Sequence, residues 1–144
     1  MASAAIASYG TLLKIGDGGG TEVFTTIAEV RDIKGPPLSM DTKEVTNQNS
    51  TGAWKEYIGT LLDGGEVTFD INYIPTETTH KLSSGLLKDM SAKTKRNFKL
   101  VFPDTGATTW LFAALIVKFD PDESVGGELK ASVSLKISGQ PTLA

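Results

Sequence analysis

The feature that most constrains the fold is a strictly alternating stretch, residues 66–73, which follows the turn Asp63-Gly64-Gly65. Apolar and polar side chains take turns along it, which predicts a strand with one face on a core. The apolar positions are Val67, Phe69, Ile71 and Tyr73, and the polar positions are Glu66, Thr68, Asp70 and Asn72. The chain therefore contains a sheet, one strand of which turns a small, polar and partly acidic face away from the core.

Most of the remaining sequence also predicts strands. Alternating apolar residues occur within 10–16, 22–35, 97–103 and 129–138, separated by turns rich in glycine and proline. The segment 109–119 differs, because Trp110, Phe112, Ala114 and Ile116 on one side face Leu111, Ala113, Leu115, Val117 and Phe119 on the other. A strand that is apolar on both sides needs cover on both, either from a helix of the same domain or from a neighbouring subunit.

One segment predicts a helix. After Pro75, the residues Leu82, Leu86 and Met90 recur four apart, which indicates an apolar stripe on a helix over 79–90. A threonine among Thr76, Thr78 and Thr79 would cap its first turn. The residues thus predict a mainly β domain with a single flanking α-helix.

Length and composition exclude several classes of protein. A chain of 144 residues fits one domain, 1–144, and no apolar run is long enough for a transmembrane helix, so membrane insertion is not expected. Residues 1–10 lack the features of a secretion signal and are expected to form a flexible arm of a cytoplasmic product. With no cysteine, stability must come from packing or association. The net charge of -3 disfavours nonspecific attraction to nucleic acid.

The segment 35–59 is too long and too polar for an ordinary connection. It is either a floppy surface loop or a projecting loop or hairpin that anchors on a partner. Trp54, Tyr57 and Ile58 favour the second interpretation, because aromatic and aliphatic side chains exposed on a loop are otherwise an aggregation liability.

The sequence predicts no enzyme, cofactor or metal site. His80 is the single histidine and is expected to be a solvated residue, and no nucleophile elbow accompanies it. The stretch 16–20, GDGGG, lacks the ending of a phosphate-binding loop and predicts a turn between strands. Residues 120–123 carry three acids that calcium would favour, but a turn of solvated acids explains them better.

The order and spacing of several motifs resemble the major tail tube protein of long, non-contractile-tailed bacteriophages and the related tube proteins of gene transfer agents. These motifs are EVTNQNSTGAWKEYIGTLLDGGEVTF, NFKLVFPD, TTWLFAALIVKFDP and ASVSLKISGQPTL. The resemblance implies an antiparallel β-sandwich or barrel with one flanking helix, a virion protein without enzymatic activity. It further implies hexameric rings that are assembled in the host cytoplasm and stacked into the hollow tail tube, a conduit for double-stranded DNA. The implied partners are a tape-measure protein, a baseplate and a tail terminator.

The resemblance also assigns roles to particular residues. Candidates for the lumen wall are Glu66, Thr68, Asp70 and Asn72, because a polar or acidic wall does not bind DNA phosphates as a lysine-lined wall would. Lys130 and Lys136 lie on the polar side of another alternating strand and do not fit a wall without lysines. Either their face points outward, or acids of neighbouring subunits neutralise them. The segments 1–10, 35–59 and 138–144 are expected to touch other rings. Candidate contact residues are Leu38, Met40, Val45, Trp54, Tyr57, Ile58 and Trp110.

The alternative is a monomeric β-sandwich that binds carbohydrate or acts as an adhesin. Exposed Trp54, Tyr57 and Tyr73 would stack on sugars, and calcium at 120–123 would support that function. The long arm and the strand that is apolar on both sides argue against it, because a monomer must cover both.

Overall fold

The computed structural model describes residues 2–123 and 125–143. Met1, Ser124 and Ala144 lie outside this description, so the predicted arms 1–10 and 138–144 are described without their end residues. The strands are β1 (Leu12–Gly16), β2 (Phe24–Thr26), β3 (Val30–Lys34), β4 (Ser39–Glu44), β5 (Tyr57–Asp63), β6 (Glu66–Asn72), β7 (Arg96–Val101), β8 (Thr109–Asp122), β9 (Lys130–Ile137) and β10 (Thr142–Leu143). The helices are the 3-10 turn η1 (Thr51–Ala53) and α1 (Leu86–Ser91). None of the helices in the described ranges has the length and apolar character that a membrane span requires.

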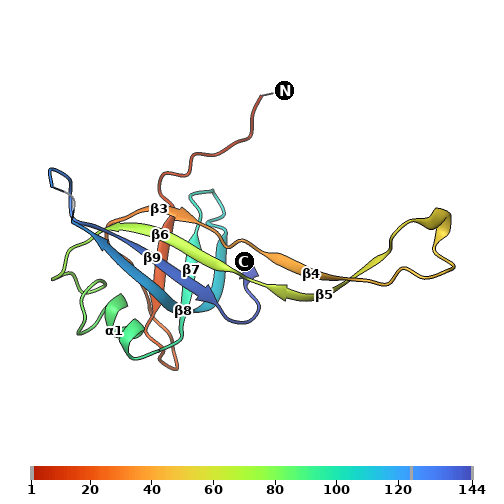
Figure 1. Cartoon of the computed structure of the whole chain (residues 1–144). Coiled ribbons are helices and arrows are strands. Elements are labelled where there is room, and N and C mark those ends of the chain that lie inside the picture. Colours follow the sequence, from red (N-terminus) through yellow and green to blue (C-terminus); the bar gives the residue numbers. More distant parts are fainter. Residues whose placement is uncertain (1, 124, 144) are drawn as a thin grey trace.

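Strand β8 joins two halves of one antiparallel sheet, whose order is β2-β1-β7-β8-β9-β6-β3. Its residues 109–114 pair with β7, and its residues 114–122 pair with β9. A register shift between Ile116 and Lys118 interrupts the pairing with β9, and such a bulge bends a strand. The two halves therefore curl toward each other around a common interior (Figure 1). This confirms the predicted mainly β, antiparallel fold.

The core is built from the alternate, apolar positions of the strands. Phe69 of β6, Phe98 of β7 and Phe112 of β8 are at most 2% exposed and come from both halves of the sheet. The rings of Phe98 and Phe112 are stacked with centroids 5.9 Å apart. In β6 and β9, buried residues alternate with partly or fully exposed ones, as the sequence pattern predicts.

The bulge in β8 also corrects one sequence prediction. Strict alternation places Phe119 on the outer side with Leu115 and Val117, but the extra residue at the bulge turns Phe119 inward. Its ring contacts Tyr73 edge to face, with centroids 5.1 Å apart. Tyr73 therefore packs against the core and is not a free surface aromatic.

The predicted helix over 79–90 is wrong in its first half. Turns occupy residues 75–84, and α1 begins only at Leu86, after Gly85 in the N-cap position. Leu86 is fully buried, whereas Leu82 is 64% exposed, so the stripe of apolar residues does not continue toward the N-terminus. Thr79 caps no helix; its hydroxyl oxygen accepts a hydrogen bond from the Ala28 backbone N–H at 3.2 Å.

His80 is fully buried, which overturns the expectation of a solvated histidine. Its Nδ1 accepts a hydrogen bond from the Ile74 backbone N–H at 3.2 Å, so Nε2 carries the proton and donates to the Ala28 carbonyl oxygen at 2.8 Å. The ring thus ties the loop after β6 to the connection between β2 and β3. Both of these part-buried backbone groups would otherwise lack a partner within the chain.

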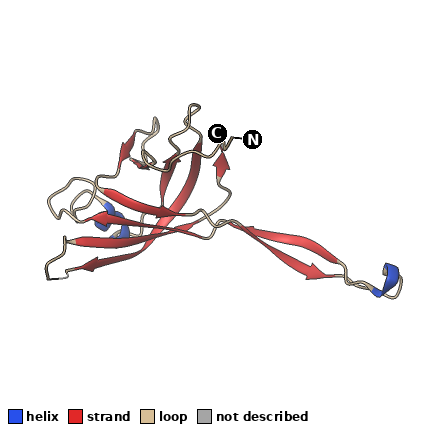
Figure 2. Ribbon diagram, turned by 90° about the horizontal axis from the view of Figure 1, so that it is seen from above, coloured by secondary structure: helices blue, strands red, loops and turns tan. Residues whose placement is uncertain are grey.

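Strands β4 and β5 form a two-stranded hairpin that projects far from the body (Figures 1 and 2). They continue β3 and β6, from which they are separated by Gly35-Pro36-Pro37-Leu38 on one side and Gly64-Gly65 on the other. Gly65 has a φ of 71°, and a Cβ there would lie 2.9 Å from the Pro37 carbonyl oxygen. The projecting arm is therefore longer than the predicted 35–59, because it includes all of β5 up to Asp63.

We expect His80→Ala to lower the free energy of unfolding by about 1–3 kcal/mol, because it removes a fully buried ring and leaves the part-buried Ile74 N–H and Ala28 carbonyl without their partners. Urea denaturation followed by circular dichroism measures the change. Lys81→Ala, one residue further on, is the control and should have little effect. Equal stability of the two variants would contradict the structural role of His80.

Candidate functional site

The predicted polar face of β6 continues across β9. Glu66 lies opposite Lys136, Asp70 opposite Ser132, and Asn72 opposite Lys130. Residues directly opposite each other in an antiparallel pair point to the same side of the sheet. The Ser132 hydroxyl donates a 2.8 Å hydrogen bond to Asp70 Oδ1. The outer side of these two strands is therefore one continuous polar surface, which we call the polar face.

The polar face carries paired charges of both signs. Lys136 Nζ lies 4.0 Å from Asp63 Oδ2, and Lys130 Nζ lies 3.8 Å from Asp122 Oδ2. On β8, Lys118 Nζ lies 3.9 Å from Asp120 Oδ2. Exposed pairs of this kind contribute little to stability, but they cancel charge locally.

These pairs revise both sequence interpretations of the two lysines. Lys130 and Lys136 share a side with Glu66 and Asn72, so their face is not separate from the predicted lumen face. Asp122 and Asp63 of the same chain already lie beside them. The pairing also accounts for Asp120 and Asp122, two of the three acids of 120–123 that suggested calcium. Within the described ranges, no group of three potential metal ligands is present.

The half-sheet β8-β9-β6-β3 ends in two open edges. Residues 115–122 of β8 pair with β9 on one side, and no other described strand pairs with them on the other. In the part of the chain that the structure describes, β3 likewise pairs only with β6. Unpaired edges present backbone N–H and C=O groups that can accept a further strand.

The arm has no core of its own. Every residue of β4 and β5 is exposed, including five large apolar side chains. These are Met40, Tyr57, Ile58, Leu61 and Leu62, which are 52–78% exposed. A two-stranded hairpin with so much exposed apolar surface is the kind of element that a partner covers.

Side-chain hydrogen bonds give the tip of the arm, residues 45–56, a defined shape. The Glu56 backbone N–H donates to Thr46 Oγ1 at 2.9 Å, and the Asn47 backbone N–H donates to Ser50 Oγ at 3.0 Å. Trp54 follows η1 and is 77% exposed. The tip therefore presents an indole ring to the surroundings without burying it in its own chain.

The outer side of β8 is a second apolar surface. Leu111, Leu115 and Val117 are 36–44% exposed, whereas Trp110 is half-buried and packs against the core of its own chain. Helix α1 packs against β8. The strand thus has one side inside the fold and leaves much of the other side open.

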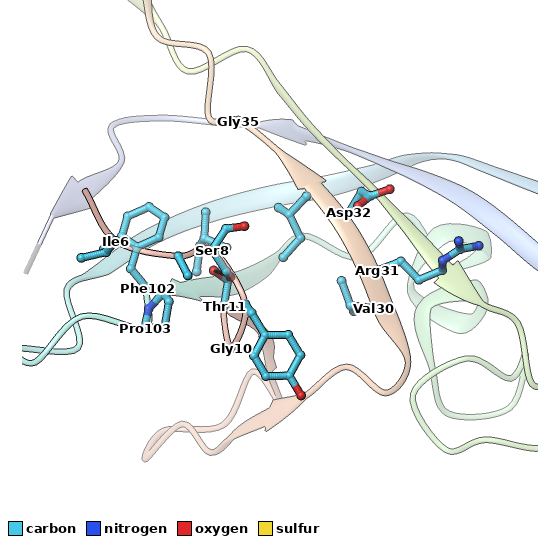
Figure 3. A pocket seen from close by; sticks show the side chains of 14 residues that line it. Ile6, Ser8, Gly10, Thr11, Val30, Arg31, Asp32, Gly35, Phe102 and Pro103 are labelled. Atoms are coloured by element: carbon cyan, nitrogen blue, oxygen red, sulfur yellow. Dashed lines mark hydrogen bonds between the residues drawn. The ribbon is translucent and has the colours of Figure 1, made fainter. Parts of the chain in front are cut away.

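A groove of about 770 Å³ lies between residues 6–11 and strand β3 (Figure 3). Phe102 and Pro103 line it on one side and Val30 and Asp32 on the other, and Gly35 stands at its end. Arg31, also in its wall, forms a 2.6 Å ion pair with Glu128. The pKa of the Glu128 carboxyl lies below its ordinary value. The main cause is a hydrogen bond from the Glu128 backbone N–H, and the second is the positive charge of the Arg31 guanidinium.

The structure gathers the predicted residues into two regions. The four lumen candidates lie together on the polar face, with Glu66 and Thr68 exposed and Asp70 and Asn72 half-buried. The contact candidates Leu38, Met40, Val45, Trp54, Tyr57 and Ile58 all lie exposed on the arm. Sequence reasoning missed Leu61 and Leu62, although two adjacent leucines just before the Asp63-Gly64-Gly65 turn fall outside the alternating pattern and were a usable signal.

Comparisons with known proteins agree with this architecture. The chain in the tail of an empty gene transfer agent (GTA) particle, refined with C6 symmetry, matches with a TM-score of 0.78 and 20% identity over 97% of this chain and 99% of that one. A chain in the virion of a native GTA particle matches with a TM-score of 0.76 and 19% identity over the same shares. No curated protein sequence matches. A family model described as "Lambda phage tail tube protein, TTP" matches residues 16–144. Since this match spans most of the sequence, the chain belongs to the lambda phage tail tube protein family.

Proposed function

We propose that this tail tube protein forms hexameric rings that stack into a hollow tube, and that double-stranded DNA passes through the tube. The whole chain, 1–144, acts as a single domain, with 1–10, the arm and 138–144 making contacts between rings. The observation that carries the proposal is the half-sheet β8-β9-β6-β3, whose inner side is apolar, whose outer side is polar on β6, on β9 and on β8 beyond its bulge, and whose two edges are unpaired.

The two open edges give this half-sheet a way to assemble. If β3 of one copy lies beside β8 of the next, six copies of four strands close a barrel of about 24 strands, which is wide enough for a water-filled lumen. The polar face then lines the lumen. The C6 symmetry named for the similar GTA tail supports six copies per ring.

The composition of the polar face suits a wall that DNA slides along. Across β6, β9 and the second half of β8, four carboxylates (Glu66, Asp70, Asp120, Asp122) lie among three lysines (Lys118, Lys130, Lys136), and Lys34 of β3, opposite Thr68, adds a fourth lysine on this side. Lys118, Lys130 and Lys136 are next to carboxylates, and Thr68, Asn72, Ser132 and Ser134 separate the charges. Such a wall offers DNA phosphates no row of free cations, so few counterions are released on contact and binding stays weak.

The family supplies the expected partners. Rings that stack head to tail repeat one contact without closing, so stacking alone does not set the length of the tube. A tape-measure protein in the lumen, a baseplate at one end and a terminator at the other would set this length. Assembly would take place in the host cytoplasm, and the finished tube would belong to the virion tail. The carbohydrate-binding alternative loses support, because Tyr73 packs inside and Asp120 and Asp122 lie beside lysines.

Electron microscopy of the concentrated protein, together with a light-scattering mass, tests the assembly directly. We expect hollow tubes of uniform width with six-fold symmetry in cross-section. Closed oligomers of fixed size, or a protein that stays monomeric at every concentration, would contradict the proposed self-assembly.

Trp54→Ala tests the role of the arm. Because Trp54 is 77% exposed, the variant should unfold at the same temperature as the unmodified protein but form tubes only at a several-fold higher concentration. Sedimentation of tubes measures the difference. The control is Leu82→Ala, which removes a similarly exposed side chain from the loop before α1. If the Trp54→Ala variant forms tubes as readily as the unmodified protein, Trp54 is not an anchor.

Glu66→Lys tests which face lines the lumen. The substitution adds a cation beside Lys136 in every copy, so tubes should retain short DNA duplexes at low salt and release them as salt rises. Co-sedimentation of a labelled duplex with the tubes measures retention. Glu77→Lys, which lies in the loop after β6, makes the same charge change away from the polar face. Equal retention by the two variants would place Glu66 away from the lumen.

A further inference from the structure

The open edge of β3 lies beside the N-terminal segment. The groove of about 770 Å³ separates residues 6–11 from β3, and β6 pairs with the other edge of this strand (Figure 3). Val30 and Ile33 of β3 pack against the core but are only half-buried, and Phe102 on the opposite wall is half-buried as well. The groove therefore leaves both the edge of β3 and part of the core uncovered.

This groove begins where the pairing of β1 with β2 ends. The two strands are antiparallel, and one residue beyond their pairing the Ile27 backbone N–H still donates to the Leu13 carbonyl oxygen at 2.9 Å. Past this bond, residues 6–11 continue the line of β1, and β3 follows β2 along the chain. These two segments form the walls of the groove. The N-terminal segment is thus placed to continue the β1–β2 ladder along β3 in the antiparallel sense.

Ala28 fixes the point at which the ladder opens. Its backbone N–H donates to Thr79 Oγ1 at 3.2 Å, and its carbonyl oxygen accepts a hydrogen bond from His80 Nε2 at 2.8 Å. Both backbone groups of Ala28 are therefore engaged by the loop before α1 and cannot pair with the N-terminal segment. Strand β3 begins two residues later, and among the described residues only β6 pairs with it.

A turn at residues 8–11 gives the N-terminal segment a hinge. The Thr11 backbone N–H donates to the Ser8 carbonyl oxygen at 3.2 Å, and Gly10 has a φ of 99°, which glycine adopts without strain. Residues 2–8, before this turn, are exposed. Within the described ranges, their backbone N–H groups donate to no other element. The segment is therefore free to change its direction relative to β3.

The length and composition of residues 2–8 suit a strand that pairs weakly. Extended, the segment spans about 23 Å at roughly 3.3 Å per residue, whereas the five residues of β3 span about 17 Å. Its sequence, ASAAIAS, is mostly alanine, which is depleted in strands. Ile6 and Tyr9 are 63% and 96% exposed and supply apolar groups that would cover the groove. Such a strand covers the edge of β3 but is easily displaced.

Residues 115–122 of β8 are the stronger partner for the same edge. In the proposed ring, this part of β8 in the next copy pairs with β3. It contains Ile116, Val117 and Phe119, whose residue types favour strands. One edge of a strand pairs with one further strand at a time. The N-terminal segment and the next copy therefore exclude each other at β3.

We propose that residues 2–8 act as a strap that closes onto β3 in the free subunit as an additional antiparallel edge strand, and that β8 of the next copy must displace this strap before a ring closes. The strap covers an edge that would otherwise accept any strand, so it keeps subunits apart until assembly begins. The proposal rests on the proposed function in one respect, which is that β8 of the next copy pairs with β3. The displaced strap is then free to make contacts between rings.

Two prolines test the closure of the strap in the full chain. Proline has no backbone N–H to donate, and in an extended strand the N–H groups of residues 4 and 7 point to opposite edges, so Ala4→Pro/Ala7→Pro removes one that faces β3. Ala4→Ser/Ala7→Ser is the matched control and keeps both N–H groups. Hydrogen exchange of the monomeric protein, followed by mass spectrometry, should be several-fold faster in β3 of the proline variant than in β3 of the control, with equal rates in β9. Equal rates in β3 would overturn the closure.

Assembly kinetics test whether the strap delays ring closure. Because the proline variant leaves the edge of β3 open, its tubes should appear after a several-fold shorter lag than those of the serine control, as measured by light scattering. If the two variants form tubes after the same lag, or if the proline variant starts later, the strap does not control ring closure.

The two measurements separate the strap from the tube itself. Faster exchange in β3 of the proline variant, together with a protein that never forms tubes, would support the strap as an edge strand and count against the conduit. Equal exchange in the two variants of a protein that forms tubes would overturn the strap and leave the tube.

Discussion

The pairing of β8 with two different strands is the constraint on which the rest of the structure depends. Its first half hydrogen-bonds to β7 and its second half to β9, with a bulge between Ile116 and Lys118. The bend at this bulge places the two half-sheets around one core. Because β7 stops pairing with β8 at Ala114, the other edge of residues 115–122 is open, and the proposed ring depends on this edge for the addition of a strand.

The strands were predictable from the sequence because their environment is periodic. In β6 and β9 each inward residue meets the core and each outward residue meets the polar face, so alternation was a sufficient signal. The helix was predicted too long, because Leu82, Leu86 and Met90 share a spacing without sharing a surface. Only tertiary contacts reveal that Leu82 is exposed and Leu86 buried. Phe119 was predicted to lie on the wrong side of β8. A bulge shifts the alternation of inward and outward side chains by one residue, and the amino-acid composition does not reveal it.

Features of the candidate site that depend on a single chain segment were predictable from the sequence. Features that depend on the pairing of strands were not. The polar residues of β6 could be named from their alternation, and the apolar residues of the arm from their polar surroundings. The ion pairs of Lys130 and Lys136 depend on register and on neighbouring strand ends, which a single sequence does not contain. The buried position of His80 was unpredictable for the same reason, because its partners Ile74 and Ala28 lie in two loops that only the fold brings together.

The direct continuation of β5 into β6, interrupted only by Gly64 and Gly65, has a mechanical consequence. In the proposed tube, a pull on an arm is transmitted along covalent backbone into the strand that lines the lumen. The side-by-side hydrogen bonds of β6 with β3 and β9 then share the load in shear. The glycine pair is itself held in place, because the Gly65 carbonyl accepts a hydrogen bond from the Ile137 backbone N–H at 3.0 Å and the Gly65 N–H donates to Asp63 Oδ1 at 2.9 Å. Such a filament would resist stretching, because the load on each arm is shared by the sheet from which the arm projects.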